Sequence, residues 1–206
     1  MPQEKPFYKT AWFWTLIVAI LVIIGFFTGV KIHNQKEADK REAAANAYKV
    51  TYSDYSKIKV GLTDGDSADK VKKDLGKTST SNVSKATGTE IATYSWNKVK
   101  NGDVGSNIAV TITDGHATNK TISGLKVKRD KKINLKQYNS VKVGAGYNDT
   151  LDKLGKPNSY LVTINKDGTT TKTIGYTSGL NGGDSAMILL TFNDNRLSDK
   201  SQLSLK

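Results

Sequence analysis

The chain repeats one pattern of residues twice, and this repetition limits its fold more than any other feature. Residues 55–61 (YSKIKVG) are matched by residues 138–144 (YNSVKVG), with Tyr, Lys, Val and Gly at a constant offset of 83 residues. Further on, Leu75-Gly76-Lys77 is matched by Leu154-Gly155-Lys156. Short identities arise by chance, but their preserved order over about 80 residues indicates an internal duplication.

The last part of each copy aligns without a gap. Residues 108–125 match residues 188–205, and both blocks alternate apolar and polar side chains as half-buried strands do. The identical pairs in these blocks are Thr111/Thr191, Asp114/Asp194, Lys120/Lys200 and Leu125/Leu205. The duplication therefore extends to the end of the chain.

Helix signals precede the strands in the first copy. Asp66 or Ser67 can cap a helix whose apolar stripe includes Val71 and Leu75, and Gly76 can end it. In the second copy the corresponding signals are a cap at Asn148 or Asp149, an inward-facing Leu154 and a stop at Gly155.

These elements predict an α+β chain. We expect an N-terminal transmembrane helix followed by two tandem repeats, each made of two helices and an antiparallel sheet. The repeats are predicted at residues 48–130 and 131–206.

Residues 11–30 form an uncharged run rich in Leu, Ile, Val and Phe. Twenty helical residues rise about 30 Å, which matches the hydrocarbon core of a bilayer. We therefore predict a membrane anchor here, in contact with lipid, with a short cytoplasmic tail at residues 1–10 and a helical or partly disordered stalk at residues 31–47. A cleaved signal peptide is the alternative, but the run is long and lacks a good cleavage site.

The predicted location is the cell membrane, with a single pass and an external C-terminal domain. The flanking charges do not favour this orientation, because four basic residues follow the apolar run within residues 31–41 and two precede it. Large domains can cross a membrane regardless of nearby charge. The external orientation therefore rests mainly on the family resemblance given below.

Catalytic and metal-binding chemistry finds little support in the composition. The chain has no Cys and only two histidines, His33 and His116, which leaves no ligand set for a zinc or iron–sulfur site. Nucleophile-elbow, phosphate-loop and metalloprotease motifs are missing. We predict a protein that is not an enzyme and needs no cofactor and no metal, with His116 as a turn residue.

The repeated motifs resemble those of the beta-lactamase inhibitor protein-like tandem-repeat family, which includes uncharacterised surface-anchored proteins of Gram-positive, lactobacillus-type bacteria. The resemblance rests on the two Tyr-x-x-Ile/Val-x-Val-Gly segments, both Leu-Gly-Lys motifs, Pro157 and the final strand blocks, and it covers residues 48–206. It implies the repeat fold and a place in the cell envelope. The first copy departs from the pattern, because Thr78 stands where the family has proline.

Two groups of residues are candidate binding surfaces. A basic segment joins the two copies and is a candidate for contact with an anionic polymer; its basic residues are Lys126, Lys128, Arg129, Lys131, Lys132 and Lys136. A solvated linker is the alternative. Tyr94 and Trp96 are candidates for an aromatic anchor on the sheet, with core packing as the alternative.

Three functions compete. The first is a membrane-anchored extracellular binding module of the bacterial cell envelope, whose partner is a protein or an anionic wall polymer. The second is a cell-wall-acting enzyme, for which the sequence offers no residues. The third is a cytoplasmic-facing membrane protein associated with DNA or another polyanion, which the net charge of +12 favours. Nucleic acid is disfavoured because the charge is spread over both copies. The sequence does not indicate the oligomeric state.

Overall fold

The fold is described from a computed structural model, which defines residues 50–86 and 89–206. These residues belong to one compact unit. Helices come in pairs before each group of four strands, in the order α3 (Tyr52–Lys57), α4 (Ala68–Leu75), β1 (Thr80–Ala86), β2 (Thr89–Asn97), β3 (Gly102–Thr113), β4 (His116–Leu125), α5 (Leu135–Ser140), α6 (Tyr147–Leu154), β5 (Ser159–Ile164), β6 (Thr170–Tyr176), β7 (Gly182–Asn193) and β8 (Arg196–Leu205).

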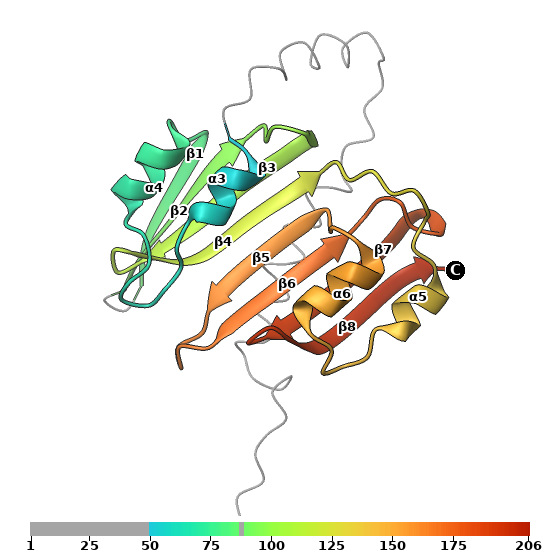
Figure 1. Cartoon of the computed structure of the whole chain (residues 1–206). Helices are drawn as coiled ribbons and strands as arrows, with labels where there is room; N and C mark the ends of the chain where they lie inside the picture. Colours follow the sequence, from blue (N-terminus) through green and yellow to red (C-terminus); the bar gives the residue numbers. More distant parts are fainter. Residues whose placement is uncertain (1–49, 87–88) are drawn as a thin grey trace, which may run out of the picture. The chain divides into compact units, whose positions relative to one another are not determined.

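All eight strands form one antiparallel sheet in which spatial order follows chain order. The two halves of the chain meet where β4 pairs with β5, with Lys120 opposite Val162 and Ile122 opposite Tyr160. The four helices lie on one face of this sheet (Figure 1). One sheet therefore runs through both halves without a break.

The predicted fold class is wrong in its architecture. We expected two helix–helix–sheet repeats, each with its own sheet, but strands dominate and the helices are only six to eight residues long. The β4–β5 ladder merges both sets of strands into the single eight-stranded sheet. The physical reason is that pairing the free edges of β4 and β5 satisfies backbone groups that separate sheets would leave open.

The predicted transmembrane helix receives no support either. Within residues 50–86 and 89–206, no helix is both long and apolar enough to cross a bilayer. The segments on which the prediction rested, residues 1–10, 11–30 and 31–47, lie outside the described residues.

Of the two predicted helix N-caps, the one at α4 is correct and the one at α6 is wrong. Ser67 caps α4, where its side chain accepts a hydrogen bond from the Lys70 amide. The predicted caps Asn148 and Asp149 lie inside α6, whose N-cap is Gly146 without a side-chain bond. The sequence reading overlooked capping boxes at the two other helices, formed by Thr51 with Asp54 and by Asn134 with Gln137.

The predicted helix stops are confirmed. Gly76 and Gly155 follow α4 and α6 with φ angles of 82° and 72°, a region that glycine enters without steric cost. The turn between β3 and β4 also fits its prediction, because Asp114 and Gly115 both have positive φ, as a tight hairpin turn requires.

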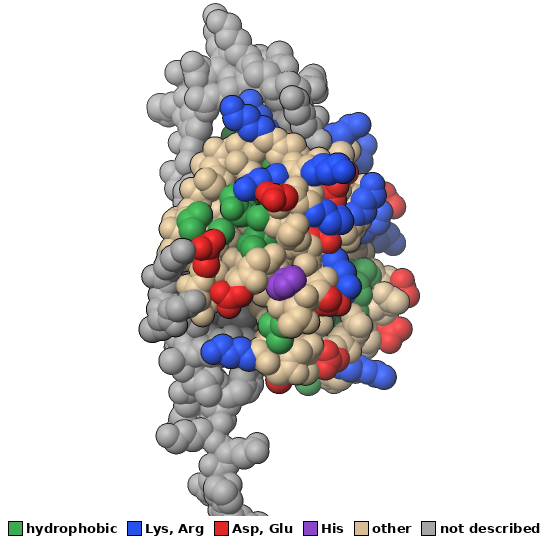
Figure 2. Space-filling model, turned by 90° about the vertical axis from the view of Figure 1, so that its left-hand side faces the viewer, with side chains coloured by type: hydrophobic (Ala, Val, Ile, Leu, Met, Phe, Trp, Pro, Cys, Tyr) green, Lys and Arg blue, Asp and Glu red, His purple; other side chains and the backbone are tan. Residues whose placement is uncertain are grey.

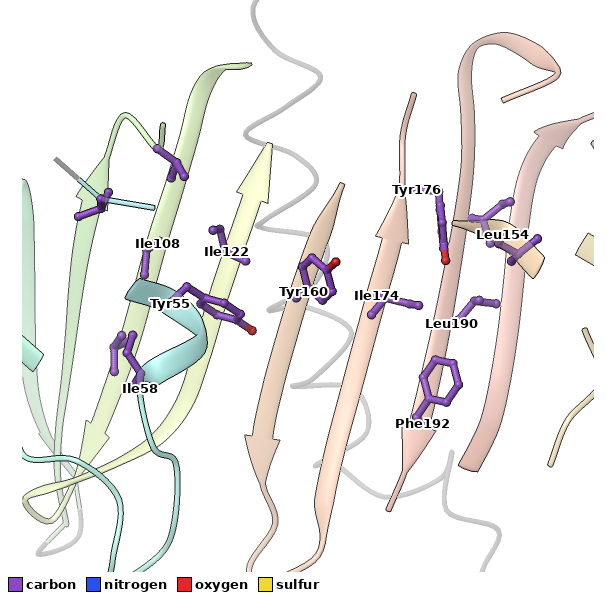
Figure 3. Packing of buried hydrophobic residues seen from close by; sticks show 14 of the residues in the cluster. Tyr55, Ile58, Ile108, Ile122, Leu154, Tyr160, Ile174, Tyr176, Leu190 and Phe192 are labelled. Carbon is purple, nitrogen blue, oxygen red and sulfur yellow. The ribbon is translucent and has the colours of Figure 1, made fainter. Parts of the chain in front are cut away.

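The core lies between the helices and the sheet. Strand residues at alternate positions supply it, and two helices close it with Val71 and Leu154. Figure 3 shows core side chains from both halves of the sheet, including Ile108, Ile122, Tyr160, Ile174, Tyr176, Leu190 and Phe192. The helices thus cover a continuous apolar surface rather than two separate ones.

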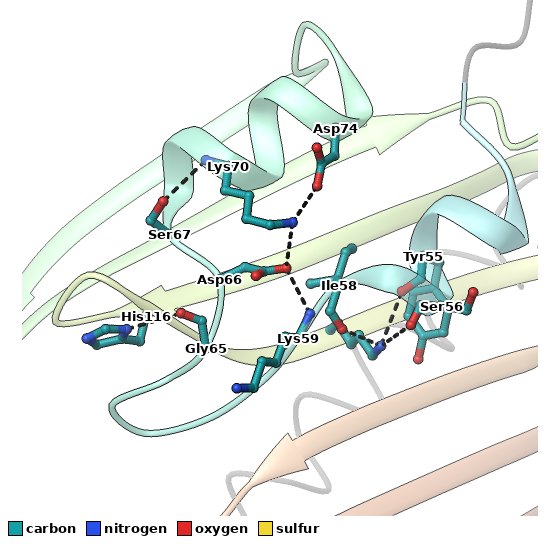
Figure 4. Close-up of polar contacts among 11 residues, drawn as sticks. Tyr55, Ser56, Ile58, Lys59, Gly65, Asp66, Ser67, Lys70, Asp74 and His116 are labelled. Carbon is teal, nitrogen blue, oxygen red and sulfur yellow. Dashed lines mark hydrogen bonds and ion pairs between the residues drawn. The ribbon is translucent and has the colours of Figure 1, made fainter.

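A buried lysine fixes the end of α3 to the sheet. Lys120 of β4 is only 8 % exposed, and its ammonium donates hydrogen bonds to the carbonyls of Tyr55, Ser56 and Ile58 at 3.2, 3.3 and 2.7 Å (Figure 4). These carbonyls belong to the last turn of α3 and its cap, where an α-helix leaves acceptors unpaired and carries partial negative charge. Burial lowers the pKa of Lys120 to about 8, so the side chain is still mainly charged at neutral pH.

The second half repeats this arrangement. Lys200 of β8 donates to the carbonyls of Tyr138 and Val141 at 3.1 and 2.7 Å, at the end of α5. Both ammonium groups also lie over a tyrosine ring of the helix they hold, at 4.8 Å from the centroid of Tyr55 and 4.2 Å from that of Tyr138. The identity of the two lysines in the duplicated sequence therefore has a structural cause.

Aromatic side chains fix the other helix of each half. The indole N–H of Trp96 donates to the carbonyl of Gly76 at 2.9 Å, and the hydroxyl of Tyr176 donates to that of Gly155 at 3.0 Å. Both glycines are helix C-caps. Every described helix is thus held at its C-terminal end by a polar group that comes from the sheet.

We predict that Lys120→Met lowers the free energy of unfolding by about 2–4 kcal/mol, because it leaves three carbonyls at the end of α3 without their donor. Methionine keeps the apolar length of the side chain, so lost packing contributes little. Urea denaturation of the two proteins measures the difference.

The matched control is Lys200→Met, which removes only two such bonds at a half-buried position. It should destabilise by about 1–2 kcal/mol. Equal and small effects of both substitutions would show that the ammonium groups do not hold the helices.

Candidate binding surface

One face of the sheet points away from the helices. Among the described residues, the paired parts of strands β2 to β7 put no charged side chain on this face. Because side chains alternate along a strand, the residues between the core positions all point to this side. We call it the hydroxyl face; its residues are Ile91, Thr93, Ser95, Asn107, Ala109, Thr111, Asn119, Thr121, Ser123, Ser159, Leu161, Thr163, Thr171, Thr173, Gly175, Leu189, Thr191 and Asn193. No described helix lies on this face (Figure 1).

Neighbouring strands are linked across the hydroxyl face by side-chain hydrogen bonds. The hydroxyls of Thr93 and Thr111 are 3.2 Å apart, and their counterparts in the second half, Thr173 and Thr191, are 3.3 Å apart. At the join between the halves, the Asn119 amide donates to the Thr163 hydroxyl at 2.8 Å. These bonds hold short side chains in fixed positions. The side chains at the middle of the face are little exposed, with Thr121, Leu161 and Thr173 at only 5–8 %.

Many lysine and arginine side chains lie toward the helix-bearing side and not at the centre of the hydroxyl face. Figure 2 shows the β1 and α4 edge of the molecule, with Lys and Arg side chains gathered mainly toward the side that bears the helices. The centre of the hydroxyl face on β2–β7 carries none of this charge.

The basic segment forms the connection between β4 and α5, except for Lys136, which lies in the first turn of α5. Its lysines, Lys126, Lys128, Lys131, Lys132 and Lys136, are exposed. They are therefore placed where an anionic polymer could reach them, and the polymer contact itself stays a prediction.

Arg129 differs from these lysines because it is packed into the fold. Its guanidinium donates to the carbonyl of Lys156 at 2.7 Å and lies 5.3 Å from the ring centroid of Tyr176. Burial lowers its pKa. The structure thus assigns Arg129 a part in holding the linker, whereas sequence composition could not separate it from its neighbours.

The two aromatic candidates lie on the helix-covered side. Trp96 is 2 % exposed and belongs to the core, in agreement with the packing alternative. Tyr94 is half-buried, and the ammonium of Lys72 lies 4.2 Å from its ring centroid. Contact of Tyr94 with a partner stays a prediction.

The loop between α3 and α4 is held by polar contacts that explain two other sequence candidates. Asp66 accepts a hydrogen bond from the Lys59 amide at 2.9 Å and pairs with the Lys70 ammonium at 3.4 Å (Figure 4). His116 begins β4 directly after the turn, and its Nδ1 lies 3.1 Å from the carbonyl of Gly65. Both side chains therefore stabilise local structure, and no cluster of three or more potential metal ligands occurs in the described part of the chain.

We predict that Arg129→Ala lowers the free energy of unfolding by about 1–2 kcal/mol, because it removes a charged hydrogen bond and the contact with Tyr176. Lys128→Ala, one residue away on the exposed surface, should change it by no more than about 0.5 kcal/mol. Denaturation curves of both variants test the distinction, and equal effects would contradict it.

Comparison with known proteins agrees with the resemblance seen in the sequence. A family described as a "Domain of Unknown Function with solved-structure structure (DUF3862)" matches residues 37–205. Among solved structures, one from Streptococcus mutans, described as a "putative beta-lactamase inhibitor protein", superposes with a TM-score of 0.60 at 26 % sequence identity; the match covers 74 % of this chain and 94 % of that one. No curated protein matches the chain.

The beta-lactamase inhibitor protein-like family predicted from the motifs is thus confirmed, and this kinship supports a non-catalytic binding module. The matched region spans the whole described sheet, so the kinship applies to the fold as a unit. The chain belongs to the DUF3862 family.

Proposed function

We propose that the chain is a non-catalytic binding module that holds a protein partner on its hydroxyl face. The observation that carries the proposal is the contrast between the two sides of the sheet, one covered by helices and the other uncharged at its centre. The cores of protein interfaces are depleted in charged residues, which matches the hydroxyl face. The similar Streptococcus mutans protein is described as a "putative beta-lactamase inhibitor protein", which supports a protein as the partner.

The same contrast argues against a polyanion on this face. An anionic wall polymer binds through several lysines or arginines, and its affinity falls as salt screens them. On this account the basic segment aids the approach of a partner and does not form the main contact. Salt dependence therefore separates the two partners that the sequence left open.

The location at the cell envelope is part of the proposal. The uncharged composition of residues 11–30 supports attachment to a membrane, and the family resemblance supports display outside the cell. Protease treatment of intact cells tests this, since an external domain is degraded without lysis. Survival of the domain in intact cells, with loss after lysis, would place it inside.

The experiment that tests the function is binding of residues 45–206, which form one compact unit, to purified cell envelope across a series of salt concentrations. Binding through an uncharged face should persist at about 0.5 M salt, where the screening length is only a few ångströms. A steep loss of binding would indicate a polyanion held by the basic segment and overturn the proposed partner.

We predict that Thr111→Lys abolishes this binding, because it puts a charge at the centre of the hydroxyl face and must be desolvated in any tight contact. Its free energy of unfolding should fall by about 1–2 kcal/mol, because Thr111 is half-buried and its hydroxyl bonds to that of Thr93. The matched control is Asn139→Lys, at an exposed position of α5 on the other side, which should bind like the wild type. Equal binding by all three proteins would exclude the hydroxyl face as the contact.

A further inference from the structure

Three residues break the internal repeat at one place in the fold. Helix α6 begins with Tyr147 where α4 begins with Ala68. In the sheet, Tyr160 and Lys172 occupy the positions that Ser81 and Ala92 hold in the first half, as their strand partners show. The second copy thus carries two phenols and an ammonium where the first copy has small side chains.

Tyr160 packs beside α3 at the join between the two halves, and Lys172 lies on the next strand, opposite Val162. The ring of Tyr160 lies 5.1 Å from that of Tyr52 and 6.4 Å from that of Tyr55, measured between centroids. The Lys172 ammonium lies 3.8 Å from the ring centroid of Tyr147. We call Tyr52, Tyr55, Tyr147, Tyr160, Lys120 and Lys172 the tyrosine–lysine cluster. Its strand residues alternate with those of the hydroxyl face and therefore point to the other side of the sheet.

One polar group of this cluster has no partner. Tyr55 is 3 % exposed, and its hydroxyl makes no hydrogen bond to any described group although it is buried. Figure 3 shows that this hydroxyl points from α3 toward β5, the strand that carries Tyr160. A buried hydroxyl without a partner costs about 1–3 kcal/mol, so its presence calls for an explanation.

The lysines of the cluster have no carboxylate partner in the described part of the chain. Among the described residues, neither Lys120 nor Lys172 forms an ion pair with a carboxylate. Lys172 is half-buried and has only the neutral Asn195 oxygen, at 3.2 Å, as a hydrogen-bond acceptor. Burial lowers the pKa of both lysines, and the repulsion of Lys172 adds to the shift of Lys120.

The phenols remain hydrogen-bond donors over the whole physiological range. Burial, followed by the neighbouring tyrosines, raises the pKa of Tyr55 and Tyr160 far above the ordinary value, and the pKa of Tyr147 rises to about 12. Neutral phenols beside two partly desolvated cations can donate to an anion and cannot repel it.

We propose that the tyrosine–lysine cluster binds a small oxyanion, a carboxylate or phosphate group. The Tyr55 hydroxyl donates to it, and the Lys172 ammonium supplies the charge. The site does not depend on the binding function proposed for the hydroxyl face. The competing explanation is that the large side chains only fill the seam between the two halves.

Calorimetric titration of the full chain with inorganic phosphate, and separately with acetate, tests the proposal at an ionic strength held constant with sodium chloride. The wild type should bind at least one of the two anions with a stoichiometry of one, and the anion that binds identifies the group. Tyr55→Phe should weaken this affinity about tenfold or more, since it removes one hydrogen bond to a charged group. Lys172→Met should weaken it by at least as much.

The matched control is Tyr138→Phe, which changes the equivalent tyrosine of the other half and should leave the affinity unchanged. Thermal unfolding without added anion checks the fold. There Tyr55→Phe should be as stable as the wild type or more so, because it removes an unpaired buried hydroxyl. Failure of the wild type to bind either anion, or equal binding by Tyr55→Phe, would overturn the proposal and leave seam packing as the role.

Discussion

The buried ammonium of Lys120 is the interaction on which the arrangement of helices and sheet depends. An α3 helix of six residues is too short to be stable alone, and its last carbonyls need donors. Lys120 supplies three of them from within the sheet, and Lys200 repeats the device at α5. Trp96 and Tyr176 do the same for the other two helices. Short helices are thereby fixed to strands that already pair with one another.

The anchoring of the helices leaves one side of the sheet without a described helix. Because all four anchored helices lie on one side, the opposite side is free to differ in chemistry (Figure 1). Threonine, serine and asparagine side chains surround Leu161 at its centre and bond to one another across the strands. The β4–β5 ladder extends this surface across both halves. The duplication thus produces one continuous face with an uncharged centre, whereas two separate sheets would present two smaller ones.

The internal repeat made much of the fold predictable. Alternating strands, the glycine stops at Gly76 and Gly155 and the Asp114-Gly115 turn all follow from local rules, and the structure contains them. The merging of the sheets was not predictable in this way, because it depends on how the linker after β4 places β5. The family resemblance, by contrast, was recognised from the order of short motifs and holds for residues 37–205.

The binding surface was predicted least well. The sequence analysis singled out basic and aromatic residues as binding candidates. It did not single out the threonines, because they are scattered along the chain and come together only when the strands pair. The identical pair Lys120 and Lys200 was visible, but lysine is almost always exposed, so nothing in the sequence indicated a buried donor. Arg129 and Trp96 were predicted as binding residues, but both are packed into the fold.

The measurement that tests the central claim most directly is a map of the contact on residues 45–206. Methyl NMR spectra of threonine- and isoleucine-labelled protein, recorded with and without purified cell envelope, would give it. The account predicts that the methyl signals of Thr93, Thr111 and Thr191 broaden, while that of Ile108, buried on the other side of the sheet, is affected least. Unchanged threonine signals together with perturbed amides in residues 126–136 would contradict it.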